Sequence, residues 1–252
     1  MSRTVALIQA RMSSSRFPGK VLQPLDGMPS ILYMVQRVRR ARLPHEAVVV
    51  TSTEASDDAL VAVLQQAQVP VWRGALDDVL ARFAGAARAF AATEVVRLTG
   101  DCPLIDPQVI DAVIALRRER GTDYAGNTDP ATFPDGLDVE CFTRDALERA
   151  AATAQRPSER EHVTLWLRDA ASGCTRANLQ AIADFSRLRL TVDYPDDLEV
   201  VRALLRLLPA DGRFDLFDIL RALSANPALA DPDRHARNEG LARSLAREDQ
   251  KP

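Results

Sequence analysis

Residues 10–20 gather charged and hydroxyl side chains that suit an anionic ligand. The stretch reads ARMSSSRFPGK and holds the cations Arg11, Arg16 and Lys20 beside three serines that begin at Ser13. A guanidinium grips two phosphate oxygens at once, an ammonium adds a point charge, and loop amides add donors. The lysine is followed by valine, and no GxGxxG occurs in the sequence, so neither a Walker A loop nor a dinucleotide-binding motif is present. Composition alone fits a polyphosphate-binding loop and a solvated turn equally well.

Two aspartates come directly after predicted strands. Asp101 stands in RLTGDCPL and Asp193 in LTVDYP. A carboxylate at the carboxyl end of a strand can hold Mg²⁺, which proteins commonly bind through one or two carboxylates together with substrate phosphates. Asp101 is also compatible with a helix N-cap, a role that suits Asp106 better. Asp196 and Asp197 follow a proline and fit the first turn of a helix, where negative charge is favourable.

The middle of the chain carries further polar groups. In FPDGLDVECF, Asp138 and Glu140 alternate with apolar residues, so on a strand they share one face and can accept hydrogen bonds from a polyhydroxylated substrate. A solvated strand face is an equally simple reading. In SEREHVT, Arg160 can grip a carboxylate, and His162 can bind a hydroxyl or help to deprotonate it. A lone helical histidine is also compatible with a structural role, and the sequence contains neither HExxH nor GxSxG.

Alternating strands and helices must position these residues. The first hundred residues predict buried strands and, between them, amphipathic helices. The strands are expected at 4–9, 47–52, 69–72 and 94–99, and the helices at 29–40, 57–67 and 76–92. Because right-handed crossovers return each strand to the same sheet, this series predicts a three-layer α/β/α fold with a mainly parallel central sheet. Ligands then bind at the carboxyl ends of its strands.

The rhythm changes after residue 120. A helix is expected to start near Pro107, and strands at 124–127 and 137–142 flank a proline-containing loop where a second substrate could be held. The elements predicted beyond it are helices at 143–153 and 158–169, a strand at 188–192, a helix from 195 to 208, and two or more helices over 215–248 broken at Asn226-Pro227. The amphipathic tail can pack on its own domain or on a neighbour.

Composition excludes several classes of protein. The 252 residues are 46% hydrophobic and 27% charged, as in ordinary globular proteins. A net charge of −3 leaves no global basic field, so we expect no nucleic-acid partner. Neither a membrane-spanning stretch nor a signal peptide is visible, so we expect a cytoplasmic protein without a membrane partner. Cys102, Cys141 and Cys174 form no CxxC, which predicts small buried or half-buried thiols.

Seven ordered blocks resemble one family. They read IQARMSSSRFPGKVL, TSTEASDDAL, RGALDDVLARF, VVRLTGDCPLIDP, FPDGLDVECF, PSEREHVT and RLTVDYPDDLEVV. Between about Thr4 and Leu208 the chain resembles the cytidylyltransferase-like family of spore coat polysaccharide biosynthesis protein F, which is related to the synthetases that activate octulosonate and nonulosonate sugars with CTP. The resemblance implies a nucleotide-diphospho-sugar transferase fold, which is Rossmann-like and shared with GT-A enzymes. We assign residues 1–211 to this nucleotidyltransferase domain and residues 212–252 to a helical tail.

The resemblance also implies roles for individual residues. The nucleotide would be bound by Ala10, Arg11, Ser13, Arg16, Lys20 and Thr99. Arg11 and Lys20 would contact the triphosphate of CTP, and with Asp101 they would form the catalytic set. Mg²⁺ would be held by Asp101 and Asp193. The sugar acid would be bound by Asp138, Glu140 and His162, and we add Arg160 because its guanidinium can grip a carboxylate. Relatives are commonly homodimers, so a homodimer is compatible with the resemblance.

Two other functions remain open at this point. A GT-A glycosyltransferase would use a ready-made nucleotide sugar on the same fold, because fold does not determine function. Such enzymes usually carry Asp-x-Asp after the fourth strand, where this sequence has Asp101-Cys102-Pro103. A non-catalytic nucleotide-binding protein is the second alternative, and the joint presence of Arg11 and Lys20 with the two strand-end aspartates argues against it.

Overall fold

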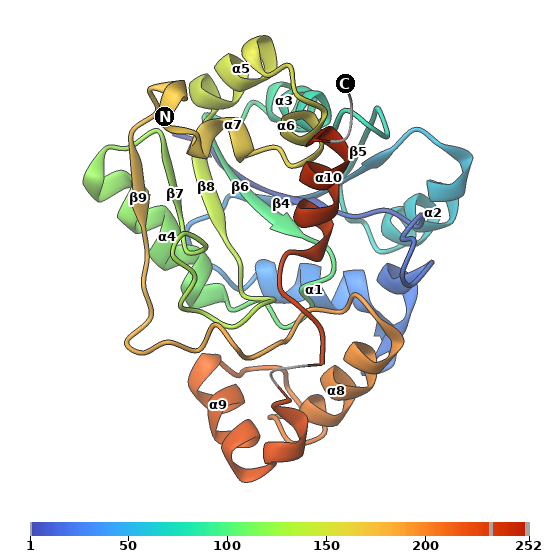
Figure 1. Ribbon diagram of the computed structural model, residues 1–252. Coiled ribbons are helices and arrows are strands. Elements are labelled where there is room, and N and C mark those ends of the chain that lie inside the picture. The colour runs from blue at the N-terminus through green and yellow to red at the C-terminus, as the bar shows by residue number, and fades with distance from the viewer. Residues whose placement is uncertain (1, 232–233, 250–252) are drawn as a thin grey trace.

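A seven-stranded sheet forms the centre of the computed structural model, which describes residues 2–231 and 234–249 (Figure 1). Its strand order is β5-β4-β1-β6-β8-β7-β9. The strands are β1 (Thr4–Gln9), β4 (Glu46–Ser52), β5 (Val71–Gly74), β6 (Glu94–Thr99), β7 (Tyr124–Gly126), β8 (Glu140–Thr143) and β9 (Arg176–Asn178). A separate hairpin joins β2 (Pro24–Leu25) to β3 (Met28–Pro29). Strands β5, β4, β1 and β6 are parallel, whereas β8 runs antiparallel to both of its neighbours.

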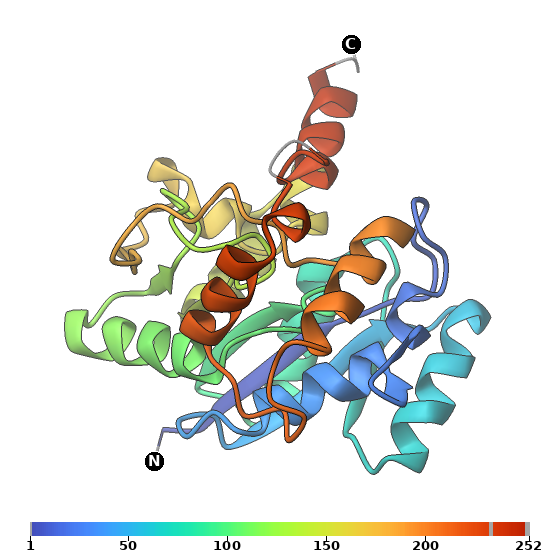
Figure 2. The same cartoon turned by 90° about the horizontal axis from the view of Figure 1, so that it is seen from below.

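Helices cover both faces of this sheet (Figures 1 and 2). The α-helices are α1 (Ser30–Val38), α2 (Asp58–Gln66), α3 (Val79–Ala89), α4 (Pro107–Arg120), α5 (Arg144–Thr153), α6 (Pro157–Glu161), α7 (Leu165–Arg168), α8 (Pro195–Leu205), α9 (Leu216–Ala225) and α10 (Glu239–Asp249). Short 3-10 turns are η1 (Lys20–Leu22), η2 (Ala55–Asp57), η3 (Ala170–Ser172) and η4 (Pro227–Leu229). One hydrophobic core joins the sheet to α1, α2, α4, α8 and α9, and the other joins it to α3, α5 and α7.

Strand β1 shows why the fold has three layers. Its residues are apolar without interruption from Val5 to Ile8, and all four are fully buried. Because side chains alternate along a strand, Ala6 and Ile8 enter one core while Val5 and Leu7 enter the other. The predicted α/β/α architecture with a mainly parallel sheet is therefore confirmed.

The first half of the chain follows the prediction closely. The expected helix at 76–92 begins only at Val79, because the Asp78 side chain caps it by accepting from the Ala81 amide at 2.9 Å. The strand expected at 69–72 begins two residues later, since Pro70 has no N–H to donate to a ladder. Asp106 caps α4 through the Gln108 amide, as expected. All three cysteines are free and buried, which was also predicted.

The second half requires corrections. The strand expected at 137–142 starts only at Glu140, because the buried Asn127 side chain bonds the backbone of residues 137 and 139 at 2.8 Å in place of a neighbouring strand. The helix expected at 158–169 is two helices, α6 and α7, separated at Val163, whose φ of 45° interrupts helical geometry. Strand β9 was not predicted.

The strand expected at 188–192 is wrong as well. This segment forms only an isolated bridge between Asp135 and Arg189. The amide of Leu190 donates to the Asp135 carbonyl, and the amide of Val192 donates to the Asp101 carbonyl, both at 2.7 Å. The segment therefore crosses the carboxyl edge of the sheet instead of joining it.

The tail packs on its own chain. The predicted break at Asn226-Pro227 is confirmed, since α9 ends at Ala225 and η4 follows. Helix α9 packs against α8, and α10 packs against α6 (Figure 1). Within residues 2–231 and 234–249, no helix combines the length and apolar composition that a membrane crossing requires.

Glu94, at the start of β6, anchors the amino edge of the sheet. Its side chain is 2% exposed and binds Arg117 at 2.6 Å, Arg118 at 2.7 Å and the Thr4 hydroxyl at 2.6 Å. Burial by itself raises the pKa of this carboxyl, but the hydrogen bonds from Arg118 and Thr4 and the charge of Arg117 outweigh burial and hold the pKa below its usual value.

We expect Glu94→Gln to lower the free energy of unfolding at neutral pH by about 2 kcal/mol, because charge-assisted hydrogen bonds are lost in a buried site. A carboxyl whose folded pKa is depressed stabilises the protein above its unfolded pKa and loses that contribution as pH falls through the folded pKa. Urea unfolding from pH 7 to pH 3 should therefore show the difference between variant and wild type shrinking with acid. Glu46→Gln, which breaks a more exposed pair with Arg3, is the control and should cost under about 1 kcal/mol. A constant difference across this pH range would contradict the prediction.

Candidate active site

A buried aspartate holds the loop that follows β1. Asp57 is fully buried, and its carboxylate accepts from the Met12 amide at 2.7 Å, the Thr51 hydroxyl at 2.8 Å and the Ser52 amide at 3.0 Å. Burial raises the pKa of Asp57, but these hydrogen bonds outweigh it and lower the pKa overall. The charged loop 10–20 is thus tied to the end of β4 and does not float as a solvated turn.

The ends of β1 and β6 approach each other closely at Gly100. The Gly100 amide donates to the Gln9 carbonyl at 2.7 Å, and a Cβ at this position would lie 2.9 Å from the Cβ of Ala10. Only glycine fits so near a neighbouring backbone. This contact brings the first loop beside Thr99 and Asp101.

Lys20 lies between the two strand-end aspartates. Its ammonium is 2.9 Å from Asp101 Oδ2 and 2.7 Å from Asp193 Oδ1, although the two carboxylates are far apart in sequence. Burial lowers the pKa of Lys20 and raises that of Asp101, but attraction between the opposite charges outweighs burial in both. The pKa of Lys20 is therefore raised and that of Asp101 is depressed. Arg16 also binds Asp193, at 2.6 Å.

Arg189 positions Asp193. It is 8% exposed, and its guanidinium binds Asp197 at 2.9 Å, Asp135 at 2.9 Å and Asp193 at 3.5 Å. Burial lowers the pKa of Arg189, but the hydrogen bonds and charge of Asp197 outweigh it and raise the pKa. Gly136, at φ 105°, leaves room for residues 190–191, since a Cβ there would lie 2.6 Å from the Thr191 amide nitrogen. The crossing segment is thereby held against the sheet edge.

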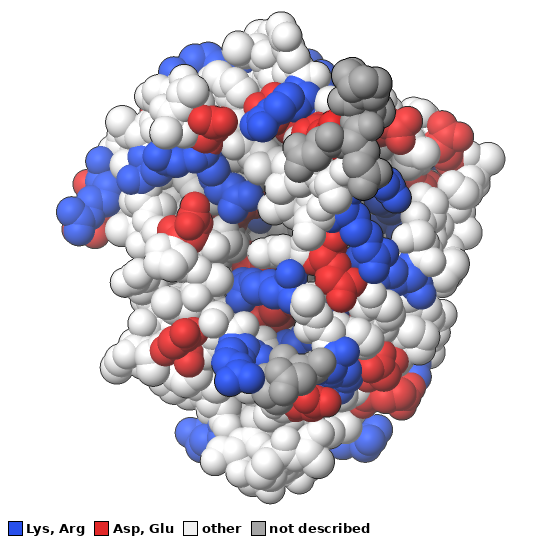
Figure 3. All heavy atoms as spheres, viewed as in Figure 1, with Lys and Arg blue, Asp and Glu red and all other residues white. Residues whose placement is uncertain are grey.

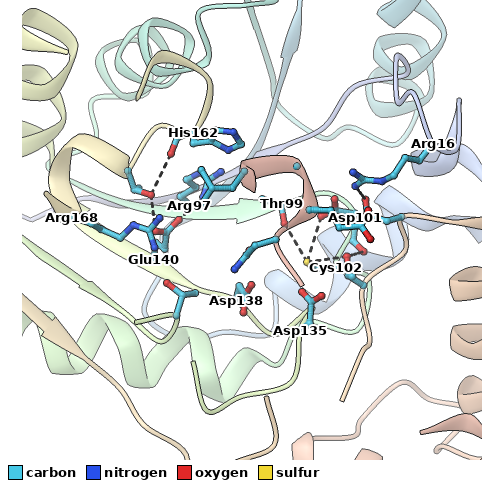
Figure 4. Close-up of a pocket in the computed structure, with 18 residues that line it drawn as sticks. Arg16, Arg97, Thr99, Asp101, Cys102, Asp135, Asp138, Glu140, His162 and Arg168 are labelled. Atoms are coloured by element: carbon cyan, nitrogen blue, oxygen red, sulfur yellow. Dashed lines mark hydrogen bonds and ion pairs between the residues drawn. The ribbon is translucent and has the colours of Figure 1, made fainter. Parts of the chain in front are cut away.

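Two adjoining hollows open at this edge. The first, which we call the loop hollow, lies beside loop 10–20 and is lined by Ala10, Arg11, Ser14, Ser15, Lys20 and Glu161. The second, the sheet hollow, lies over β6 and β8 and is lined by Arg97, Asp135, Asp138, Glu140, Thr164 and Arg168 (Figure 4). The residues common to both are Arg16, Thr99, Asp101, His162, Asp193 and Gly240. On the face shown in Figure 3, basic and acidic side chains are interspersed.

Glu140 forms the floor of the sheet hollow. It is 5% exposed, accepts from the hydroxyls of Tyr124 and Thr164 at 2.7 Å each, and forms an ion pair with Arg97. Burial raises the pKa of Glu140, but the charges of Arg97 and Arg168 outweigh it and lower the pKa. Glu140 is therefore a fully engaged carboxylate that orients its neighbours.

Asp138 and His162 are held by the tail. Asp138 is paired with Arg237, yet burial outweighs this partner and raises the pKa of Asp138 to about 7. His162 Nε2 lies 3.0 Å from the Ser244 hydroxyl, and burial lowers the pKa of the imidazole below its usual value. Residues 238–241 line the sheet hollow as well. The C-terminal segment thus forms one wall of this hollow.

Most of the predicted site residues meet at the two hollows, but two do not. Ser13 is exposed, and Ser14 and Ser15 line the loop hollow in its place. Arg160 faces away from both hollows: it forms an ion pair with Asp78 and donates to the Ala151 carbonyl at 2.7 Å, so it ties α6 to the start of α3. This geometry does not support the expectation that Arg160 binds substrate, and we leave Arg160 out of the proposed sugar-acid site.

Sequence reasoning missed several lining residues. Arg97 had a visible signal, because it is a charge inside an otherwise apolar strand. Arg168 had no visible signal in the sequence, because it was expected to lie within one continuous helix. The tail residues 238–241 were missed because no local pattern shows where a distant helix will pack.

The pair of Asp101 and Asp193 fits a hard divalent cation. Both carboxylates lie at the carboxyl edge, both line the two hollows, and the single ammonium of Lys20 now occupies the position between them. Carboxylate oxygens shared with substrate phosphates are the usual environment of Mg²⁺. Asp196, Asp197 and His235 also cluster, but Asp197 is engaged by Arg189 and by the Asp193 and Tyr194 amides.

Comparison with known proteins decides the family. Residues 5–206 match the family model of cytidylyltransferases. The chain belongs to the cytidylyltransferase family. This cytidylyltransferase is 31% identical to spore coat polysaccharide biosynthesis protein SpsF of Bacillus subtilis over 237 residues, which cover 91% of this chain and 98% of that protein. The predicted enzyme class, nucleotidyltransferase, is thereby confirmed.

Other relatives agree. A 3-deoxy-manno-octulosonate cytidylyltransferase of Anaeromyxobacter sp. (strain K) is 30% identical over 244 residues, covering 81% of this chain and 98% of that protein. A solved cytidylyltransferase structure from Leptospira borgpetersenii superposes with a TM-score of 0.88 at 28% identity, covering 94% of this chain and all of that one. The predicted nucleotidyltransferase fold is confirmed, and the glycosyltransferase and non-catalytic alternatives lose their support.

Proposed function

We propose that this cytidylyltransferase transfers CMP from CTP to a sugar acid, an octulosonate, a nonulosonate or a similar compound, for surface polysaccharide biosynthesis in the cytoplasm. The observation that carries the proposal is the convergence of Lys20, Asp101 and Asp193 where the loop hollow meets the sheet hollow. A polyphosphate suits the cationic loop hollow, and a polyhydroxylated acid suits the sheet hollow. The junction between them is where the two substrates would react.

The reaction needs little covalent chemistry from the protein. A hydroxyl oxygen of the sugar forms a bond to the α-phosphorus of CTP, the bond from that phosphorus to the bridging oxygen breaks, and pyrophosphate leaves. Arg11 and Lys20 neutralise charge on the phosphates as this bond breaks. Asp138, whose pKa lies near neutrality, is the carboxylate that we propose accepts the hydroxyl proton.

Asp101 and Asp193 would hold Mg²⁺. When bound, the ion neutralises phosphate charge and orients the triphosphate. For both carboxylates to bind the ion, the Lys20 ammonium must leave its position between them. Within the loop hollow, the phosphates of CTP would then be the new partner of this ammonium. Ala10, Arg16 and Thr99 complete the proposed nucleotide site, and Ser13 remains a proposed support of the loop from outside it.

Pyrophosphate release tests the proposal. The four ribonucleoside triphosphates are crossed with 3-deoxy-octulosonic and nonulosonic acids in the presence of Mg²⁺. We expect release with CTP and a sugar acid only. Release with another triphosphate, or with CTP and a neutral sugar but no acid, would contradict the assignment.

Removing the metal gives a second measurement. With EDTA in excess, we expect pyrophosphate release to fall below detection and to return when Mg²⁺ is added beyond the chelator. The reason is that two carboxylates at the edge would otherwise repel the triphosphate. Full activity in EDTA would remove Asp101 and Asp193 from the role of metal ligands. We separately propose that the enzyme is a homodimer, which analytical ultracentrifugation would test.

A further inference from the structure

The cations that line the two hollows divide into paired and unpaired groups. They are Arg11, Arg16, Lys20, Arg97 and Arg168. Three of them have carboxylate partners: Lys20 binds both strand-end aspartates, Arg16 binds Asp193, and Arg97 binds Glu140. Among the residues that the structure describes, the guanidinium groups of Arg11 and Arg168 have neither a hydrogen bond nor an ion pair within 4.0 Å. Arg11 lies in the loop hollow and Arg168 in the sheet hollow.

Arg168 is held at the wall of the sheet hollow. It is the last residue of the short helix α7, which follows the helix break at Val163, and Thr164 beside this break donates to Glu140 at 2.7 Å. The side chain is half-buried, and its Nε is buried without a hydrogen-bond partner among the described residues. Figure 4 shows the side chain reaching from α7 toward Glu140. A buried donor without an acceptor is costly, which is a reason to expect that a ligand supplies one.

The charge of the sheet hollow strengthens this expectation. Its carboxylates are Asp101, Asp135, Asp138, Glu140, Asp193 and Glu239. An anionic substrate would be repelled from such a hollow unless a cation remained available to it. Arg97 is engaged by Glu140, and Arg237 is engaged by Asp138. Burial lowers the pKa of Arg168, but the charge of Glu140 outweighs burial and raises the pKa above its usual value. No carboxylate of the described residues forms an ion pair with the Arg168 guanidinium within 4.0 Å. Among the described arginines that line this hollow, Arg168 is therefore the one that need not break an ion pair to bind a ligand.

We infer that Arg168 binds the carboxylate of the sugar-acid substrate and thereby selects acids over neutral sugars. The inference rests on the proposed function and names the residue that gives it specificity. A guanidinium matches a carboxylate through two parallel hydrogen bonds, so it distinguishes an acid from an amide or an alcohol of the same shape. The role that the sequence assigned to Arg160 thus falls to a residue eight positions later in the chain.

Steady-state kinetics with two substrates test this inference. The variant Arg168→Met is compared with wild type, using the sugar acid that supports turnover and its carboxamide analogue. With the acid, we expect KM to rise about 10- to 100-fold, with kcat and the KM for CTP nearly unchanged, because an interaction made equally in ground and transition states is lost. With the carboxamide, variant and wild type should behave alike, since the partner of Arg168 is absent.

Two further variants control for structure. Arg149→Met removes an exposed arginine of α5 that pairs with Asp123, and it should match wild type with both substrates. Arg168→Lys keeps the charge but not the paired donors, so its KM for the acid should lie between those of wild type and Arg168→Met. An equal loss with acid and carboxamide, or a raised KM for CTP, would overturn the inference.

Calorimetry separates this inference from the proposed function. Binding of 3-deoxy-octulosonic acid and of a nonulosonic acid is measured in the presence and absence of CTP. If an acid binds wild type and Arg168→Met weakens it, the inference stands even where no pyrophosphate is released and the proposed reaction fails. If pyrophosphate is released but acid binding is the same in both proteins, the function stands and the inference falls. If wild type binds neither acid, the inference is overturned.

Discussion

Asp101→Asn is expected to lower the rate of pyrophosphate release about a hundredfold or more while the protein stays folded. The carboxylate lies at the end of β6, beside both hollows, with Lys20 Nζ at 2.9 Å. Asparagine keeps the shape but neither neutralises Lys20 nor serves as a charged ligand for Mg²⁺. Losing one charged contact in a preorganised site costs on the order of 3 kcal/mol of transition-state stabilisation.

The control for this variant is Asp196→Asn. Asp196 is also an aspartate close to Asp193, but it is exposed in the first turn of α8 and faces His235. Its replacement should leave turnover within about twofold of wild type, because exposed pairs contribute little. Near-normal turnover by Asp101→Asn, with circular dichroism and melting unchanged, would show that our assignment of this residue is incorrect.

Lys20→Ala is expected to cost a similar factor in turnover, for a different reason. The ammonium neutralises Asp101 and Asp193 together, so its loss leaves two carboxylates facing each other. We therefore expect the variant to bind Mg²⁺ more tightly than wild type while its pyrophosphate release falls about a hundredfold, since the phosphate contact is gone.

Metal titration by calorimetry and the pyrophosphate assay measure the two effects of Lys20→Ala separately. Arg88→Ala removes an exposed cation that pairs with Glu148 on the outer helices, so it controls for a general change in charge. If Lys20→Ala bound Mg²⁺ more weakly, or turned over at the wild-type rate, the ammonium would not have the role that we give it.

Local periodicity was sufficient to predict the first half of the fold. Strand β1 contains an uninterrupted apolar run, strand β6 is apolar apart from Glu94, Arg97 and Thr99, and the two pair in the predicted parallel sheet. Beyond residue 120, distant partners decide the structure. Asn127 delays β8 by bonding the backbone that precedes it, and Asp135 draws residues 188–192 across the sheet edge. No window of sequence contains both partners of such a contact.

The candidate site divides in the same way. Lys20, Asp101 and Asp193 were predictable, because each lies in a segment that follows a strand expected from the sequence. Segments that follow parallel strands meet at the carboxyl edge of the sheet. Arg160 was expected at the sugar site, but the structure pairs it with Asp78, which is 82 positions away in the chain and which no local pattern reveals. Arg168 became visible only after the break had been located, since helical periodicity says nothing about the direction of a short helix that follows a left-handed residue.

The C-terminal segment has one further consequence. Residues 238–241 line the sheet hollow, Arg237 contacts Asp138, and Ser244 contacts His162. Arg237, Ser244 and residues 238–241 all lie beyond residue 206, where the match to the family model ends. The loop and the aspartates at the sheet edge lie within that match. If the sheet hollow holds the sugar, as we propose, exchanging residues 207–252 between relatives would change the choice of sugar and leave the nucleotide chemistry intact, and chimaeras joined after residue 206 would test this.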